Sequence, residues 1–201
     1  MKKVNYSGHG MKEVILASAS PRRKELLGEI GLRFKVEPSN YDEDIPSALE
    51  PHELARKISF EKAKVVADKY QNVIVIAADT FIVFGDQILG KPHTEKEARR
   101  MLEAISGQSH FVITGFTIID TGNHKTLSKS VETKVDIRKL TLAEIDAYVK
   151  SKEPLDKAGA YAIQGLGAVF VEKIEGDYSN VIGLPLTALT ETLKEFGINI
   201  L

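Results

Sequence analysis

The stretch "NVIVIAADTFIVF", residues 72–84, decides the fold class of this chain. It is a nearly continuous apolar run rich in β-branched residues, which is typical of a strand buried on both faces of a sheet. Predicted helices lie on either side of it in the sequence, at 51–70 and 94–106. The alternation of strands with helices predicts an α/β protein.

The rest of the chain continues this alternation and makes the predicted sheet mixed. Two strands joined by the turn "TGNHK" form a hairpin, which requires antiparallel pairing. Two capping-box patterns, Thr94 with Glu97 and Thr141 with Glu144, predict where two helices begin. We expect further strands at 13–18, 34–39, 110–120 and 127–140, and helices at 20–31 and 141–151 and near the C-terminus.

Composition excludes several classes of function. The 201 residues allow a sizeable core, in one domain or two closely packed lobes, and a net charge of −1 creates no overall field toward nucleic acid or membrane. The absence of cysteine excludes a thiol nucleophile, thiolate metal ligands and disulfides. No apolar run approaches a membrane span, and no signal peptide is visible. We expect a cytoplasmic protein with a single domain over 11–201 and an N-terminal extension, 1–10, without an assigned role.

The stretch "SPRRKELL", residues 20–27, predicts an anion pocket. Ser20 is a suitable N-cap, but Arg22, Arg23 and Lys24 fill a first helical turn where the helix dipole disfavours cations. A bound anion would offset that cost, because free backbone N–H groups at a helix start bind phosphate and guanidinium groups match its oxygens. A solvated basic turn is the alternative.

Asp79 interrupts the long apolar run within "AADT". A carboxylate in a buried strand is costly unless it is paired or bound to a metal, and ligand sites of sheets lie at strand ends. Asp79 is therefore a candidate metal ligand or general base, with a cap at the strand end as the alternative. Thr80 follows, with its hydroxyl on the other face of the strand.

Three lysines and an amide are further candidates. Lys62 falls on the apolar face of the helix predicted at 51–70, so it either snorkels to solvent or points into a polar cleft. Lys91 lies in the rigid turn "GKP". In "DKAGAYAIQG", Lys157 stands beside small residues and Gln164 carries an amide that could read a base edge, although this segment could also be a plain tight turn.

An acidic run, residues 42–44, could ligate Mg²⁺ together with substrate phosphates, or it could be a solvated loop. Several familiar motifs are missing from the sequence. There is no P-loop, no complete G-x-G-x-x-G, no H-E-x-x-H and no nucleophile elbow. A P-loop kinase, a Rossmann dehydrogenase, a zincin and a serine hydrolase all lose support.

Five motifs resemble the Maf family in order and spacing, from about Met11 to the C-terminus. They are "LASASPRRKELL", "AADT", "GKPHTEKEARRML", "DKAGAYAIQGLGAVFV" and "GDYSNVIGLPL". The resemblance implies a nucleoside triphosphate pyrophosphatase with an α/β fold related to the inosine triphosphatases: a mixed, twisted sheet with flanking helices and two lobes around a central cleft. It also implies a homodimer, a house-cleaning role and an association with septum formation.

The resemblance assigns roles to individual residues. Asp79 is expected to be the proton acceptor and, with Glu43, to ligate a divalent metal cation, Mg²⁺ or Mn²⁺. The positions linked to base specificity are Arg22, Thr80 and Gln164. Those on the phosphate side are Ser18, Arg23, Lys62, Lys91 and Lys157.

The segment "DKAGAYAIQGLGA" resembles the dTTP/UTP pyrophosphatase subgroup. The expected reaction is attack by water that releases the monophosphate and pyrophosphate, without a covalent intermediate, on dTTP, UTP and, as further candidates, modified pyrimidine nucleotides. Two alternatives remain open. One keeps the chemistry and changes the base, for example to 7-methyl-GTP, and the other is a non-catalytic nucleotide-binding regulator of cell division.

Overall fold

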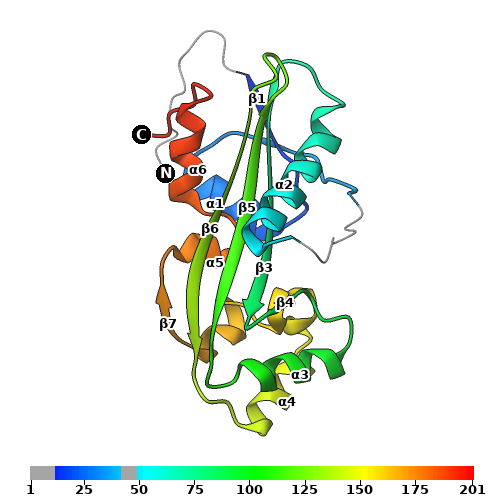
Figure 1. Cartoon of the computed structure of the whole chain (residues 1–201), viewed down its shortest axis with the longest axis vertical. Coiled ribbons are helices and arrows are strands. Elements are labelled where there is room, and N and C mark those ends of the chain that lie inside the picture. The colour runs from blue at the N-terminus through cyan, green and yellow to red at the C-terminus, as the bar shows by residue number, and fades with distance from the viewer. Residues whose placement is uncertain (1–11, 42–48) are drawn as a thin grey trace. The chain divides into compact units, whose positions relative to one another are not determined.

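A mixed sheet forms the framework of the chain (Figure 1). The computed structural model describes residues 12–41 and 49–201, and within them seven strands are ordered β2-β1-β3-β5-β6-β7, with β4 paired to β3. Strand β1 pairs in parallel with β2 and β3, whereas β3–β4 and β6–β7 are antiparallel. The predicted mixed α/β sheet is confirmed. The strands are β1 (Glu13–Leu16), β2 (Lys35–Val36), β3 (Val73–Phe84), β4 (Gln87–Leu89), β5 (Ser109–Asp120), β6 (Thr126–Ile137) and β7 (Val171–Glu175).

The helices expected from the sequence are all present. The α-helices are α1 (Pro21–Glu29), α2 (Pro51–Ala67), α3 (Glu95–Ile105), α4 (Leu142–Lys150), α5 (Tyr178–Ile182) and α6 (Leu186–Lys194). The sequence did not predict α5 or three short 3₁₀ helices, η1 (Glu153–Asp156), η2 (Ala158–Ala160) and η3 (Gly165–Phe170). These elements are too short to show a helical period. In the described part of the chain, no helix has both the length and the apolar character needed to cross a bilayer.

The two predicted capping boxes have different outcomes. Thr141 and Glu144 form the complete box at the start of α4. At α3, Thr94 Oγ1 accepts from the Glu97 N–H at 3.2 Å, but the Glu97 carboxylate accepts from the N–H of His93 at 2.7 Å and not from that of Thr94. This half of the prediction was wrong. Either bond gives the carboxylate one backbone donor, so the sequence pattern does not separate them.

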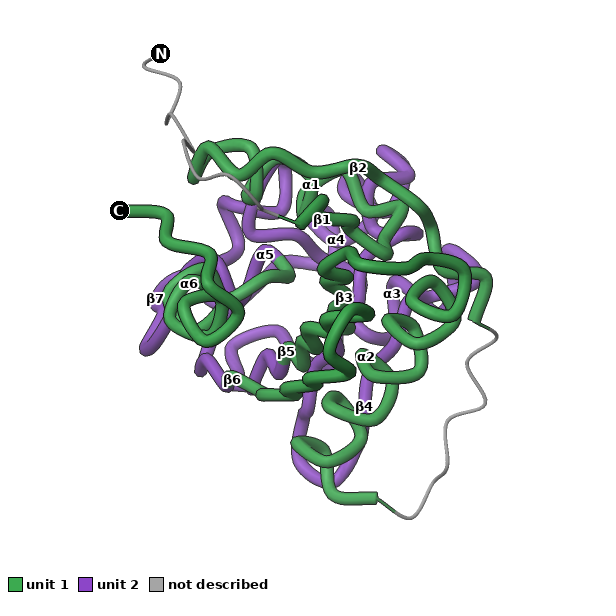
Figure 2. Tube along the Cα trace, turned by 90° about the horizontal axis from the view of Figure 1, so that it is seen from above, with its two compact units in different colours: residues 1–79, 114–131, 183–201 green, residues 80–113, 132–182 purple. Residues whose placement is uncertain are grey.

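The chain divides into two compact units (Figure 2). Unit 1 comprises residues 1–79, 114–131 and 183–201, and unit 2 comprises residues 80–113 and 132–182. Helices α1, α2 and α6 belong to unit 1, whereas α3, α4, α5 and strand β7 belong to unit 2. Strands β3, β5 and β6 each have residues in both units, and in β3 the division falls between Asp79 and Thr80. The predicted boundary between extension and domain lies outside the described residues.

The core of unit 1 covers both faces of β3. Val75 and Ala77, two residues apart, belong to one buried cluster with Ala63 and Val66 of α2. Ile76 points to the opposite face and is 0% exposed. Figures 1 and 2 show α2 on one side of these strands and α6 on the other. The prediction of a strand buried on both faces is confirmed for this part of β3.

The core of unit 2 gathers around α3 and α4, which pack against each other. Leu102 of α3, Ile145 of α4 and Val135 of β6 belong to one buried cluster. Two aromatic rings close it, since Tyr148 of α4 meets Phe170 edge to face with centroids 4.9 Å apart. Ala160 and Tyr161, which follow Lys157 in the chain, belong to the same cluster.

Candidate active site

Asp79 and Lys62 form an ion pair in unit 1. The alternation of side chains along β3 places Asp79 on the same face as Val75 and Ala77, which is the face that α2 covers. Lys62 of α2 donates from Nζ to Asp79 Oδ1 at 2.6 Å, and the two side chains are only 14% and 13% exposed. The lysine on the apolar helix face therefore ends on a carboxylate, and each charge compensates the other in a poorly hydrated place.

The two oxygens of Asp79 differ in their contacts with the described residues. Oδ2 makes no hydrogen bond with the residues that the structure describes. Among residues 12–41 and 49–201, no cluster of three His, Cys, Asp or Glu side chains could hold a metal ion. Mg²⁺ can bind with one or two carboxylates plus substrate phosphates, so Asp79 Oδ2 fits such an ion. Glu43, the other expected metal ligand, lies outside the described residues.

Ser18 and Arg23 come together at the end of β1. The Ala17 N–H donates to the Ile76 carbonyl at 2.7 Å, which extends the parallel pairing of β1 with β3 up to the turn before α1. The Arg23 guanidinium folds back from the first turn of α1. It donates from Nη1 to Ser18 Oγ at 3.2 Å and from Nε to the Gly183 carbonyl at 2.8 Å. The hydrogen bond between Arg23 and Ser18 therefore connects two of the residues that were expected on the phosphate side.

The start of α1 has the features of the predicted pocket. Ser20 is the N-cap, and its hydroxyl accepts from the Arg23 N–H at 3.5 Å. Arg22 and Arg23 are half-buried, whereas Lys24 is exposed. Anion binding here stays a prediction.

Unit 2 contains the other candidate site residues. Within it, the segment around Lys91 and the segment around Lys157 contact each other. The Gly159 N–H donates to the Gly90 carbonyl at 2.9 Å, so the residues next to the two lysines share a backbone hydrogen bond. Gly159 has φ +65°, and a Cβ on it would lie 2.4 Å from Ile82 Cδ1 of β3. A side chain here would be strained by the backbone conformation and would have to displace the end of the Ile82 side chain.

The remaining candidates of unit 2 lie on different elements. Thr80 is half-buried on β3, and the Lys157 ammonium pairs with the Asp156 carboxylate. Gln164 is exposed and precedes η3 with an extended backbone, φ −111° and ψ 160°. Its amide is therefore open to solvent.

Two features were missed by sequence reasoning. The carbonyl of Gly183 holds Arg23, and the motif "VIGLPL" contained no signal for this role. In unit 2, His110 Nε2 lies 2.8 Å from Tyr161 Oη in a buried pair. Burial lowers the pKa of His110 to about 4, although the nearby charge of Asp136 acts to raise it. His110 was one of several scattered histidines without a motif.

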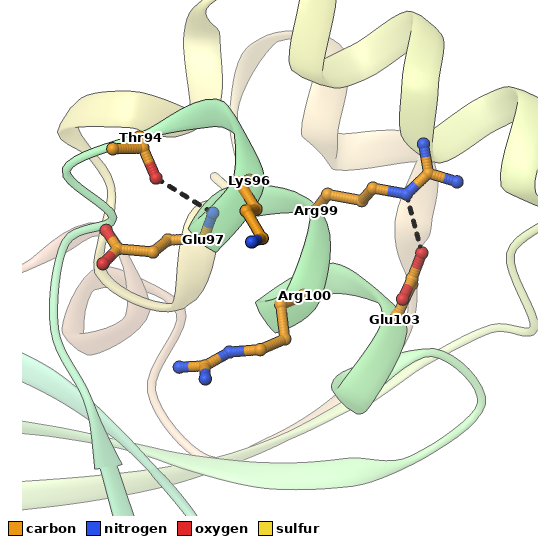
Figure 3. Close-up of a pocket in the computed structure, with 6 residues that line it drawn as sticks. All are labelled: Thr94, Lys96, Glu97, Arg99, Arg100 and Glu103. Carbon is orange, nitrogen blue, oxygen red and sulfur yellow. Dashed lines mark hydrogen bonds and ion pairs between the residues drawn. The ribbon is translucent and has the colours of Figure 1, made fainter.

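A surface pocket on α3 contains none of the predicted site residues (Figure 3). Two hydrogen bonds join its residues: Arg99 Nε donates to Glu103 Oε1 at 2.8 Å, and the Glu97 N–H donates to Thr94 Oγ1 at 3.2 Å. It is lined by Thr94, Lys96, Glu97, Arg99, Arg100 and Glu103. We assign no role in the reaction to it.

Several proteins named dTTP/UTP pyrophosphatase resemble this chain over most of its length. The protein of Methanosarcina barkeri is 49% identical over 191 residues, which cover 94% of this chain and 97% of its own. That of Methanococcoides burtonii is 51% identical and covers 94% and 98%. That of Bacillus cereus is 45% identical and covers 98% and 96%.

Two solved structures share the fold. A HAM1 protein from Coxiella burnetii superposes with a TM-score of 0.53 at 18% identity, covering 92% of this chain and 100% of its own. The Ham1 protein of Staphylococcus aureus has a TM-score of 0.51 at 13% identity, with the same coverage. A model of the Maf-like proteins matches residues 13–196, and the chain therefore belongs to the Maf-like protein family.

Proposed function

We propose that this chain hydrolyses dTTP and UTP between the α and β phosphates, releasing the monophosphate and pyrophosphate. The names of relatives that are 45–51% identical over nearly the whole chain support the choice of substrate. The proposal includes a cytoplasmic homodimer.

The observation that carries the reaction type is the Lys62–Asp79 pair. Attack by water on a phosphate needs a group that accepts the proton of the water and positive charge near the phosphate oxygens. Asp79 Oδ2 accepts that proton, while Lys62 holds Oδ1 at 2.6 Å and so orients the carboxylate. Arg23, held by Ser18 and Gly183, presents its guanidinium at the helix start that binds phosphate.

A divalent cation, Mg²⁺ or Mn²⁺, is part of the proposal. Asp79 would hold it through one lone pair of Oδ2, which leaves the second lone pair for the proton of the water, and substrate phosphate oxygens and Glu43 would be further ligands. When bound, such an ion neutralises phosphate charge and lowers the pKa of a water molecule. On the phosphate side we place Ser18, Arg23, Lys62, Lys91 and Lys157.

The base is proposed to be recognised by Gln164, Arg22 and Thr80. An amide carries both a donor and an acceptor, which suits the polar edge of a pyrimidine. Replacing Gln164 by alanine should change the relative rates on dTTP, UTP and GTP. Unchanged relative rates would place base recognition on other residues.

The test of the function is pyrophosphate release from dTTP and UTP by the purified chain with Mg²⁺. In Asp79→Asn the turnover should fall by about 10²–10⁴-fold, the usual contribution of a general base, with the fold retained. The matched control is Asp68→Asn, which changes an exposed carboxylate at the end of α2 in the same unit and should leave the rate unchanged. A near-normal rate in Asp79→Asn would contradict the role proposed for Asp79. An inactive wild type would contradict the proposed function itself.

A further inference from the structure

The carboxylate of Glu153, at the start of η1, accepts three hydrogen bonds within unit 2. Oε1 accepts from the hydroxyl of Tyr148 on α4 at 2.9 Å and from the Gly167 N–H at 3.1 Å. Oε2 accepts from the Leu166 N–H at 3.1 Å. Two of the three donors belong to the backbone of one turn, and that turn begins directly after Gln164.

The turn is shaped to admit this carboxylate. Gly165 has φ +75°, and a Cβ on it would lie 2.9 Å from Glu153 Oε2. A Cβ on Gly167 would lie 2.6 Å from the Tyr148 hydroxyl and from the Ala162 carbonyl oxygen. Side chains at either position would push the acceptor and donors apart. The two glycines leave room for the carboxylate, and two of the three hydrogen bonds fix it to the backbone of the turn.

The charge of Glu153 strengthens this arrangement. Burial acts to raise the pKa of the carboxyl, but hydrogen bonds from the N–H groups of Gly167 and Leu166 and from the Tyr148 hydroxyl, together with the charge of Lys157, hold it below its ordinary value. Glu153 is therefore ionised at neutral pH. Hydrogen bonds to a carboxylate are shorter and roughly twice as strong as those between neutral groups.

We propose that Glu153 is a positioning residue for Gln164 and, through it, for the choice of nucleobase. The inference rests on the proposed function, in which Gln164 reads the base. The Gln164 side chain is exposed, so its position depends on the backbone from which it projects, and that backbone continues directly into the turn that Glu153 holds. A displacement of about 1 Å in a positioning group can cost on the order of a hundredfold in rate. Glu153 prevents such a displacement by binding the backbone of the next residues.

The first experiment compares Glu153→Gln with the unaltered chain. The amide keeps the size of the side chain but replaces one acceptor oxygen by an NH₂ group, so a hydrogen bond to the turn is lost. We expect the ratio of kcat/KM for dTTP to that for GTP to fall by about tenfold. Glu103→Gln is the matched control, because the Glu103 carboxylate accepts from Arg99 within α3 of the same unit and makes no hydrogen bond to this turn among the described residues. It should leave the ratio unchanged.

A double-mutant cycle with Gln164→Ala separates positioning from a general structural role. In the Gln164→Ala background, adding Glu153→Gln should leave the dTTP/GTP ratio unchanged, and a further tenfold change there would overturn the inference. If Glu153→Gln does not fold, Tyr148→Phe removes one donor, keeps the ring and should shift the ratio in the same direction. If the wild type is active and the folded variant has the same dTTP/GTP ratio as the wild type, this inference alone is overturned. A wild type without turnover on dTTP, UTP and GTP overturns the proposed function and this inference together.

Discussion

Lys62 Nζ lies 2.6 Å from Asp79 Oδ1, although the two residues are 17 positions apart and belong to a helix and a strand. Each is charged, and each occupies a face that is otherwise apolar. Both side chains are mostly buried. Removal of either charge therefore leaves the other charge buried without a compensating partner, which destabilises the folded state.

Replacing Lys62 by methionine should therefore destabilise the fold. The Asp79 carboxylate would lose its donor, at a cost of about 1–3 kcal/mol in the free energy of unfolding. Urea denaturation measures this loss, with Lys64→Met on the exposed face of α2 as the control. The double variant Lys62→Met/Asp79→Asn should regain most of the stability but none of the activity. Additive losses in the double variant would show that the two charges are not coupled.

Arg23→Lys tests whether the guanidinium is needed or only its charge. Lysine lacks the planar guanidinium group of arginine, so it cannot donate to both Ser18 Oγ and the Gly183 carbonyl in the same fixed geometry. We expect a loss of about 1 kcal/mol in stability and a raised KM for dTTP. Lys24→Gln, in the same turn but exposed, should change neither quantity. An unaltered KM for dTTP in a folded Arg23→Lys protein would contradict the role proposed for the Arg23 guanidinium group.

His110 makes stability depend on pH. Its pKa is about 4 in the folded state and near 6.5 when unfolded, because the buried ring beside Tyr161 resists protonation. The neutral His110 ring makes its full contribution to the free energy of unfolding above pH 6.5. That contribution, about 3 kcal/mol in total, is lost as the pH falls toward 4. The difference between wild type and His110→Gln in urea denaturation across this range isolates the effect, and the exposed His93→Gln is the control. Parallel pH curves for wild type and His110→Gln would refute it.

Gly115→Ala should disrupt the packing of α2 on β5 in unit 1. A Cβ at this position would lie 2.1 Å from the Ala55 carbonyl oxygen, and backbone atoms cannot move aside as a flexible side chain can. We expect a loss of about 3 kcal/mol or more, measured as a lower midpoint of denaturation. Gly28→Ala is the opposite case, since that glycine lies inside α1 with open space around it. It should stabilise the protein by roughly 0.5–1 kcal/mol.

Much of the fold could be predicted because its signals are local. The apolar run of β3, the Ser20 cap of α1 and the Thr141–Glu144 box of α4 depend on residues a few positions apart. The donor chosen by Glu97 at α3 was predicted wrongly, because two neighbouring N–H groups serve its carboxylate equally well. The short helices around Glu153 were not expected, because they are too short to show a periodic pattern, and η3 is in addition held by hydrogen bonds to the distant Glu153 carboxylate.

The sequence by itself determined the α/β class and the strand buried on both faces, since periodicity and caps are encoded over three or four positions. It proposed the candidate site residues from single charged positions and from the five motifs. Only the tertiary structure decided that Lys62 meets Asp79, that Arg23 reaches Gly183, and that Glu153 holds the turn after Gln164. These contacts join segments that are brought together by the packing of helices on strands. No short stretch of sequence contains the geometry of that packing.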